Sequence, residues 1–75
     1  MVEQLSKLLF RESFRPFRII LNNGRQFHVW DREYVMLSPG GDTIVVCGRD
    51  GLSDLLAVRM IESCRLDPID PYISR

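Results

Sequence analysis

Apolar and polar residues follow two different periods along this chain, and the change of period separates a helix from a β region. Residues 2–12 predict one amphipathic helix, because aliphatic side chains recur there at helical spacing. These side chains are Val2, Leu5, Leu8 and Leu9. The residue before Pro16 is pushed toward extended geometry, so we expect the helix to stop by residues 13–15.

Two apolar runs, residues 17–21 and 25–30, flank Asn22-Asn23-Gly24 and predict a β-hairpin. A two-residue loop would mix polar and apolar side chains on both faces. A three-residue loop, with Gly24 in the left-handed region, separates them, and a slip of one residue would exchange the faces. We therefore expect an inner face of Phe17, Ile19, Leu21, Phe27 and Val29, and an outer face of Arg18, Ile20, Gln26 and His28.

The second half of the chain predicts further strands at residues 34–37 and 43–47, separated by the turn-forming segment 38–42. Residues 53–66 are ambiguous. They fit a helix, because Leu55, Val58 and Ile61 recur at period three, or a strand, one 3-10 turn and a last strand. We favour the second interpretation.

A helix followed by short strands with frequent turns predicts a mainly β fold, which we interpret as a small five-stranded antiparallel barrel, SH3-like or Sm-like, with an N-terminal helix. Residues 1–66 form this single domain, and residues 67–75 form a flexible or extended C-terminal tail with little to bury. Because 75 residues bury only a small core, a domain of this size often needs a disulfide, a metal or a second subunit for stability.

Charge and composition narrow the class of partner. The chain has ten basic and ten acidic side chains, and a nucleic-acid-binding domain usually shows a basic surplus. Its basic residues gather over 7–32, so a local basic patch stays open as an alternative. No segment has the length of a membrane span, and Met1–Phe10 is too short and too charged for a signal region. We expect a cytoplasmic protein with no membrane partner.

Residues that carry catalytic or metal chemistry are scarce. His28 is the only histidine, and neighbouring Asp31 and Glu33 match no catalytic triad or zinc motif. Cys47 and Cys64 form no CxxC pair and lie in apolar strands, where cysteine acts as a small hydrophobic residue. The sequence therefore predicts a protein that is not an enzyme, with no catalytic residues, no cofactor and no metal.

Surplus apolar residues on both faces of the strands predict association with another protein. In residues 43–47, Ile44 and Val46 alternate with Val45 and Cys47, and both sets are apolar. A strand of an antiparallel sheet needs only one apolar face unless something covers the other. We expect a homo-oligomer or a protein partner, unless the helix and the tail cover the second face. The expected interaction surface is Ile20, Trp30, Ile44 and Val46, with Arg18 and Arg32 at its rim.

The alternative function is binding of RNA or single-stranded nucleic acid. Bases would stack on an aromatic ring while arginines neutralise the phosphates. The residues expected to do so are Arg15, Arg18, Arg25, Arg32 and Trp30.

The opening helix and Phe17-Arg18-Ile19-Ile20-Leu21-Asn22-Asn23-Gly24-Arg25 resemble the helix and first hairpin of the bacterial Sm-like RNA chaperone family. Leu55-Leu56-Ala57-Val58-Arg59-Met60-Ile61 resembles the family's second motif, but Leu55 and Leu56 stand where the family has its RNA-contacting Lys-His pair. Val29 replaces a usual glycine. The resemblance implies an Sm-like fold without that RNA contact. Residues 14–19, Phe-Arg-Pro-Phe-Arg-Ile, also resemble the opening of a set of small bacterial proteins, which implies no activity.

Overall fold

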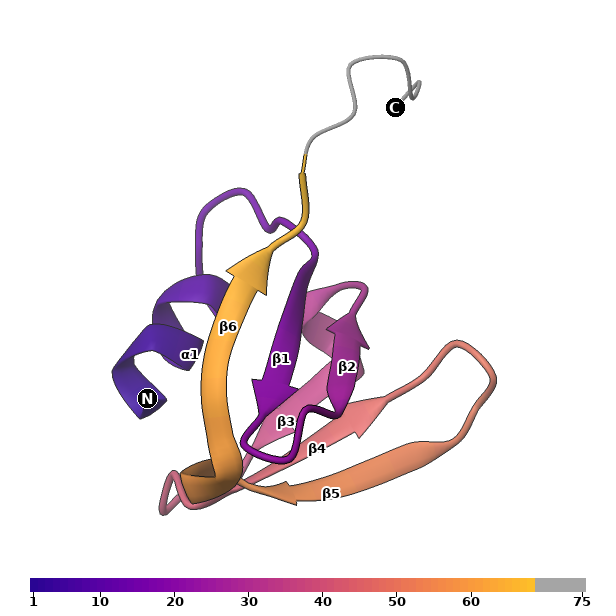
Figure 1. The fold of residues 1–75 in the computed structure, drawn as a ribbon. Coiled ribbons are helices and arrows are strands. Elements are labelled where there is room, and N and C mark those ends of the chain that lie inside the picture. The colour runs from indigo at the N-terminus through magenta and orange to yellow at the C-terminus, as the bar shows by residue number, and fades with distance from the viewer. Residues whose placement is uncertain (69–75) are drawn as a thin grey trace.

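The computed structural model describes residues 1–68 as one N-terminal helix and six strands in two antiparallel sheets. The helix is α1 (Val2–Leu9), and the strands are β1 (Phe17–Leu21), β2 (Gln26–Val29), β3 (Val35–Leu37), β4 (Thr43–Cys47), β5 (Ser53–Ala57) and β6 (Ile61–Leu66). Two 3-10 turns, η1 (Arg32–Tyr34) and η2 (Val58–Met60), precede β3 and β6. The strand orders are β2-β1-β6 and β3-β4-β5 (Figure 1).

The predicted mainly β fold with an N-terminal helix is confirmed. The strands of residues 1–68 form two separate sheets and do not close into a barrel, so the five-stranded barrel is not confirmed. Residues 69–75, which make up most of the predicted tail, lie outside the described residues.

The first hairpin has the three-residue loop that the hydrophobic pattern predicts. Gly24 has φ +87°, a left-handed conformation that glycine adopts without steric cost. The Leu21 N–H donates to the Arg25 carbonyl at 2.9 Å and closes the loop. The register pairs Phe17 with Val29 and Ile19 with Phe27, so the predicted faces are confirmed.

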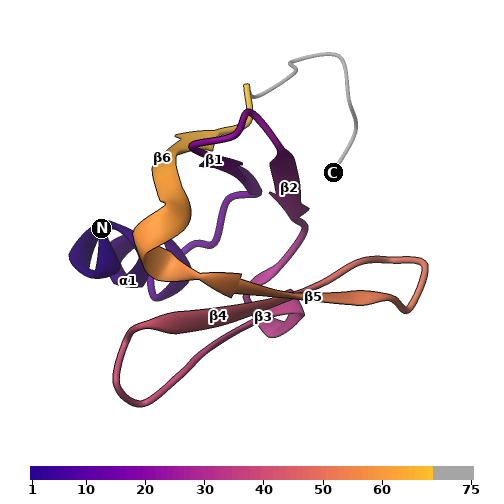
Figure 2. The same cartoon turned by 60° about the horizontal axis from the view of Figure 1, so that its bottom comes forward.

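Residues 53–66 form a strand, a 3-10 turn and a strand, as favoured over the helix. The turn η2 carries the chain from one sheet to the other (Figure 2). Two hydrogen bonds fasten it, because the Val58 N–H donates to the Asp42 carbonyl and the Asn22 N–H donates to the Met60 carbonyl, both at 2.9 Å. A continuous helix would place these apolar residues on one stripe instead of between two sheets.

The helix α1 ends at Leu9 rather than at residue 12. Residues 10–13 are exposed, so no further buried contact extends the helix. The Arg32 guanidinium donates from Nε to the Leu9 carbonyl at 2.9 Å and from a terminal nitrogen to the Arg11 carbonyl. The first bond satisfies one of the carbonyls that a helix end leaves free, and the second holds the chain just after the helix.

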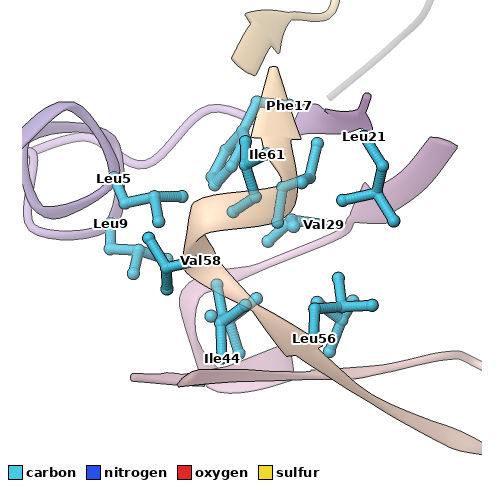
Figure 3. Close-up of a cluster of buried hydrophobic side chains, with 12 residues drawn as sticks. Leu5, Leu9, Phe17, Leu21, Val29, Ile44, Leu56, Val58 and Ile61 are labelled. Atoms are coloured by element: carbon cyan, nitrogen blue, oxygen red, sulfur yellow. The ribbon is translucent and has the colours of Figure 1, made fainter. Parts of the chain in front are cut away.

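The core lies between the inner faces of the two sheets and is closed on one side by α1 (Figure 3). Leu5 and Leu9 enter from the helix, and the remaining buried side chains come from both sheets and η2. Those residues are Phe17, Ile19, Leu21, Val29, Val35, Ile44, Val46, Leu56, Val58 and Ile61.

The interaction residues predicted on β4 are wrong. Ile44 is 0% and Val46 3% exposed, so both belong to the core and are closed to a partner. Val45 and Cys47 lie on the opposite face and are half-buried. Because both sets are apolar, the alternation in this strand does not distinguish its two faces, and only packing against the other sheet does.

Candidate interaction surface

The outer face of the β3-β4-β5 sheet carries no charged side chain at the strand positions that pair across it. The register pairs Met36 with Val45, and Val45 with Leu55, so these positions share the face opposite Ile44 and Val46. The full set on this outer face is Met36, Thr43, Val45, Cys47, Ser53, Leu55 and Ala57. We call it the uncharged face.

A row of three apolar residues crosses the uncharged face from strand to strand. Met36 on β3 is 63% exposed and Leu55 on β5 is 74% exposed, with half-buried Val45 between them. An antiparallel sheet with one solvated face normally alternates apolar-inward and polar-outward residues. The row departs from that rule in a chain of which 27% of the residues are charged.

Sequence reasoning missed Met36 and Leu55 because each lies beside another apolar residue. Met36 stands between Val35 and Leu37, and Leu55 precedes Leu56. The direct signal would have been strand register, since pairing with Val45 places both side chains on the same face as that residue.

The predicted anchors Ile20 and Trp30 lie away from the uncharged face. Ile20 is half-buried on the outer side of β1, in the other sheet. Trp30 is also half-buried, and its ring lies nearly perpendicular to the His28 ring, with 3.8 Å between the two centroids. The Arg49 guanidinium lies over the Trp30 ring, 3.9 Å from its centroid. The structure therefore does not gather the predicted surface residues in one place.

The arginines expected at a rim or on nucleic acid make contacts within the chain. Arg32 binds the end of α1, as described above. Arg15 donates to the Asp67 carbonyl at 2.8 Å, and the Arg18 Nε lies 3.4 Å from the Asp67 carboxylate. The Arg25 guanidinium lies over the Phe27 ring at 5.0 Å. These contacts bring Arg15 and Arg18 together at Asp67, whereas Arg32 lies at the end of α1.

Asp67 joins β1 and β2 to the end of β6. Its carboxylate contacts His28 Nε2 and Arg18 Nε, and these two residues pair across the hairpin. His28 and Asp67 are 39 positions apart along the chain, so no local sequence motif predicts the contact. His28 therefore has a structural partner, and Asp67 is fastened to the domain rather than free.

An open cleft of about 380 Å³ lies between β2 and the turn that joins β4 to β5. His28, Trp30, Arg49 and Asp54 are among the residues that line it. Within residues 1–68 no three His, Cys, Asp or Glu side chains lie close enough together to hold a metal ion. The cleft thus presents mixed charges around an aromatic ring that Arg49 already covers.

The two cysteines are free thiols. Cys64 on β6 is half-buried beside Met1, with 3.9 Å between their sulfur atoms. Burial raises the pKa of the Cys64 thiol to about 11, and the positive N-terminus acts weakly in the opposite direction. At neutral pH this group is therefore a thiol and not the reactive thiolate.

No family model, no curated protein and no solved structure matches this chain. Across residues 1–68 no helix combines the length and the apolar character that crossing a membrane requires. The uncharged face, defined by register and exposure, is the candidate site that the geometry supports best.

Proposed function

We propose that this chain is a small, non-enzymatic, cytoplasmic interaction module that associates with copies of itself through the uncharged face. The observation that carries the proposal is the row Met36-Val45-Leu55, which exposes apolar side chains on the solvent side of a sheet. Burial of such a row in a second molecule removes apolar surface from water, which is the main favourable contribution to most protein association.

The strength of association follows from the exposure of two side chains. Full burial of a leucine or methionine contributes roughly 1.5–3 kcal/mol, so Leu55 and Met36, at 74% and 63% exposure, contribute about 1–2 kcal/mol each. Two copies together gain about 4–8 kcal/mol from these residues. The entropic cost of association is of similar size, about 4–15 kcal/mol. We therefore expect a weak oligomer that dissociates on dilution.

The finer fold assignment belongs to the same proposal. We infer that the two sheets are an opened form of an Sm-like or SH3-like barrel. The element order supports this inference, because a short 3-10 turn, η2, joins the last two strands and a helix precedes the first. Nucleic-acid binding is the weaker function, since Arg15, Arg18 and Arg32 contact groups of the chain itself.

Sedimentation equilibrium over a concentration series, from low micromolar to millimolar, tests self-association. We expect the average mass to rise with concentration in the wild-type protein and to stay near that of a monomer in Leu55→Lys. Loss of two buried Leu55 side chains removes about 2–4 kcal/mol, which weakens association by about 30- to 700-fold.

Phe10→Lys is the matched control, because Phe10 is 73% exposed against 74% for Leu55 but lies at the end of α1. This variant should associate like the wild-type protein. A wild-type protein that is monomeric at every concentration would refute self-association. Equal effects of Leu55→Lys and Phe10→Lys would refute the uncharged face as the contact.

A further inference from the structure

The free edge of β5 has backbone groups that point away from the sheet. Two hydrogen bonds mark the ends of the β4-β5 ladder, from the Gly48 N–H to the Leu52 carbonyl at 2.8 Å and from the Val58 N–H to the Asp42 carbonyl at 2.9 Å. Hydrogen-bonded and non-hydrogen-bonded pairs alternate along an antiparallel ladder. Counting between these ends, Asp54 and Leu56 bond to β4, whereas Ser53, Leu55 and Ala57 point their N–H and C=O groups outward.

This edge is one of the four sheet edges formed by residues 1–68, and it has few of the features that protect an edge strand. β5 is the last strand of its sheet and forms its lower border in Figure 1. Proteins usually protect an edge with a short strand, a proline, a bulge or charged side chains. β2 has four residues and β3 only three, and β6 carries Glu62 and Arg65, whereas β5 has five residues and one charge, Asp54.

Symmetry limits how a second copy can use this edge. Two β5 strands related by a two-fold axis must run antiparallel, with each residue facing its counterpart across the axis. An axis at Leu55 places Leu55 opposite Leu55, and Ser53 opposite Ala57. All the outward-pointing N–H and C=O groups then meet partners in hydrogen-bonded pairs. The same register places Asp54 opposite Leu56, so no like charges face each other.

The two neighbouring symmetric registers are worse. An axis at Asp54 brings the carboxylates of the two copies into the same cross-strand pair, where like charges destabilise a sheet. It also leaves Ala57 beyond the paired segment, and an axis at Leu56 leaves Ser53 beyond it. The hydrogen bonds therefore favour the axis at Leu55 over both neighbours, and the charges also disfavour the axis at Asp54.

We propose that a second copy of this chain pairs along β5 in antiparallel register centred on Leu55. The pairing joins two β3-β4-β5 sheets into one six-stranded sheet with a continuous uncharged face. It rests on the proposed self-association and moves the contact from the whole row to its β5 end. The two Leu55 side chains meet across the axis, whereas Val45 and Met36 stay on the open face of the joined sheet. The edge, the symmetry and the register together predict a closed dimer rather than an open chain of subunits.

Cysteine cross-linking measures the register. In a Cys47→Ser, Cys64→Ala background, three variants each carry one cysteine: Leu55→Cys, Ser53→Cys and Ala57→Cys. Opposed residues of a hydrogen-bonded pair lie about 5.5 Å apart at Cα, within disulfide reach. Leu55→Cys should give a covalent dimer on mild oxidation or with a short thiol-reactive cross-linker. Ser53→Cys and Ala57→Cys should each fail alone and should cross-link when the two proteins are mixed.

Amide hydrogen exchange on the unmodified protein gives a second measurement that needs no substitution. The amides of Ser53, Leu55 and Ala57 should exchange more slowly at high protein concentration than at low concentration. The amides of Asp54 and Leu56 should change little, because β4 already accepts their hydrogen bonds.

The outcomes separate this proposal from the proposed function. A protein that associates by sedimentation but cross-links Ser53→Cys to itself, or keeps the Leu55 amide exchange independent of concentration, would overturn the β5 pairing and leave self-association standing. A protein that is monomeric throughout would overturn both.

Discussion

The inward direction of Val46 on β4 can be tested against its neighbour on the same strand. Val46 is 3% exposed and packs in the core, whereas Val45 is half-buried on the uncharged face. Val46→Ala and Val45→Ala remove the same two methyl groups from adjacent residues. Any difference between them therefore reports which face of β4 is buried.

The expected cost for Val46→Ala follows from its burial. Removal of two buried carbons at about 0.8 kcal/mol each, plus the energy of the cavity left behind, lowers the free energy of unfolding by about 1.5–3 kcal/mol. A chain of 75 residues has roughly 4–11 kcal/mol of stability, so the variant stays folded. Val45→Ala removes partly exposed carbons and should cost less than about 1 kcal/mol.

Urea unfolding and thermal unfolding, both followed by the fluorescence of Trp30, the single tryptophan, measure the two variants. The samples should be dilute, so that association through the uncharged face does not contribute. The melting temperature of Val46→Ala should fall by about 6–24 °C, at about 4–8 °C per kcal/mol for a domain of this size. An equal loss in Val45→Ala would mean that both faces of the strand are buried to the same degree, and a larger loss would mean that the faces are reversed.

Two further predictions concern the end of α1 and the thiol of β6. Arg32→Met keeps the aliphatic stem but loses the hydrogen bonds to the Leu9 and Arg11 carbonyls. It should lower the free energy of unfolding by about 1 kcal/mol and reduce the helical circular dichroism signal. An unchanged spectrum and stability would show that these bonds contribute nothing. Cys64, with its pKa raised from 9.0 to about 11 by burial, should react slowly with iodoacetamide at pH 8 in the folded protein and faster in urea, as peptide mass spectrometry would show. Because the Cys64 thiol ionises at lower pH in the unfolded chain, the free energy of unfolding should also fall as pH rises from 9 towards 11. Equal labelling rates in the folded and unfolded states would contradict the burial of this thiol.

The first hairpin shows what local pattern can predict. One register separates polar from apolar residues, and the loop supplies a glycine for the left-handed position, so Phe17 pairs with Val29 as expected. Pattern and turn chemistry agree there, and no distant contact is needed to choose between registers.

Strand β4 shows where local pattern fails. Its residues are apolar at every position from Ile44 to Cys47, so alternation gives no direction. The structure points Ile44 inward and leaves Val45 outward, which moves the candidate surface to Met36 and Leu55. The contacts of the arginines could not be predicted for a related reason. The carbonyls and the Asp67 carboxylate that bind them are distant from them in sequence.

The order of helix, hairpin, strands and 3-10 turn came from the sequence alone, because each depends on the spacing of apolar residues and on nearby glycine, asparagine or proline. The tertiary structure decided the inward face of β4, the separation into two sheets and the contacts of Arg18, Arg32 and Asp67. These properties depend on which segments meet in space, and residues far apart along the chain carry no local signal of that meeting. The outer face of β3-β4-β5 could be identified as an uncharged surface only once the structure showed which side of the sheet is buried in the core.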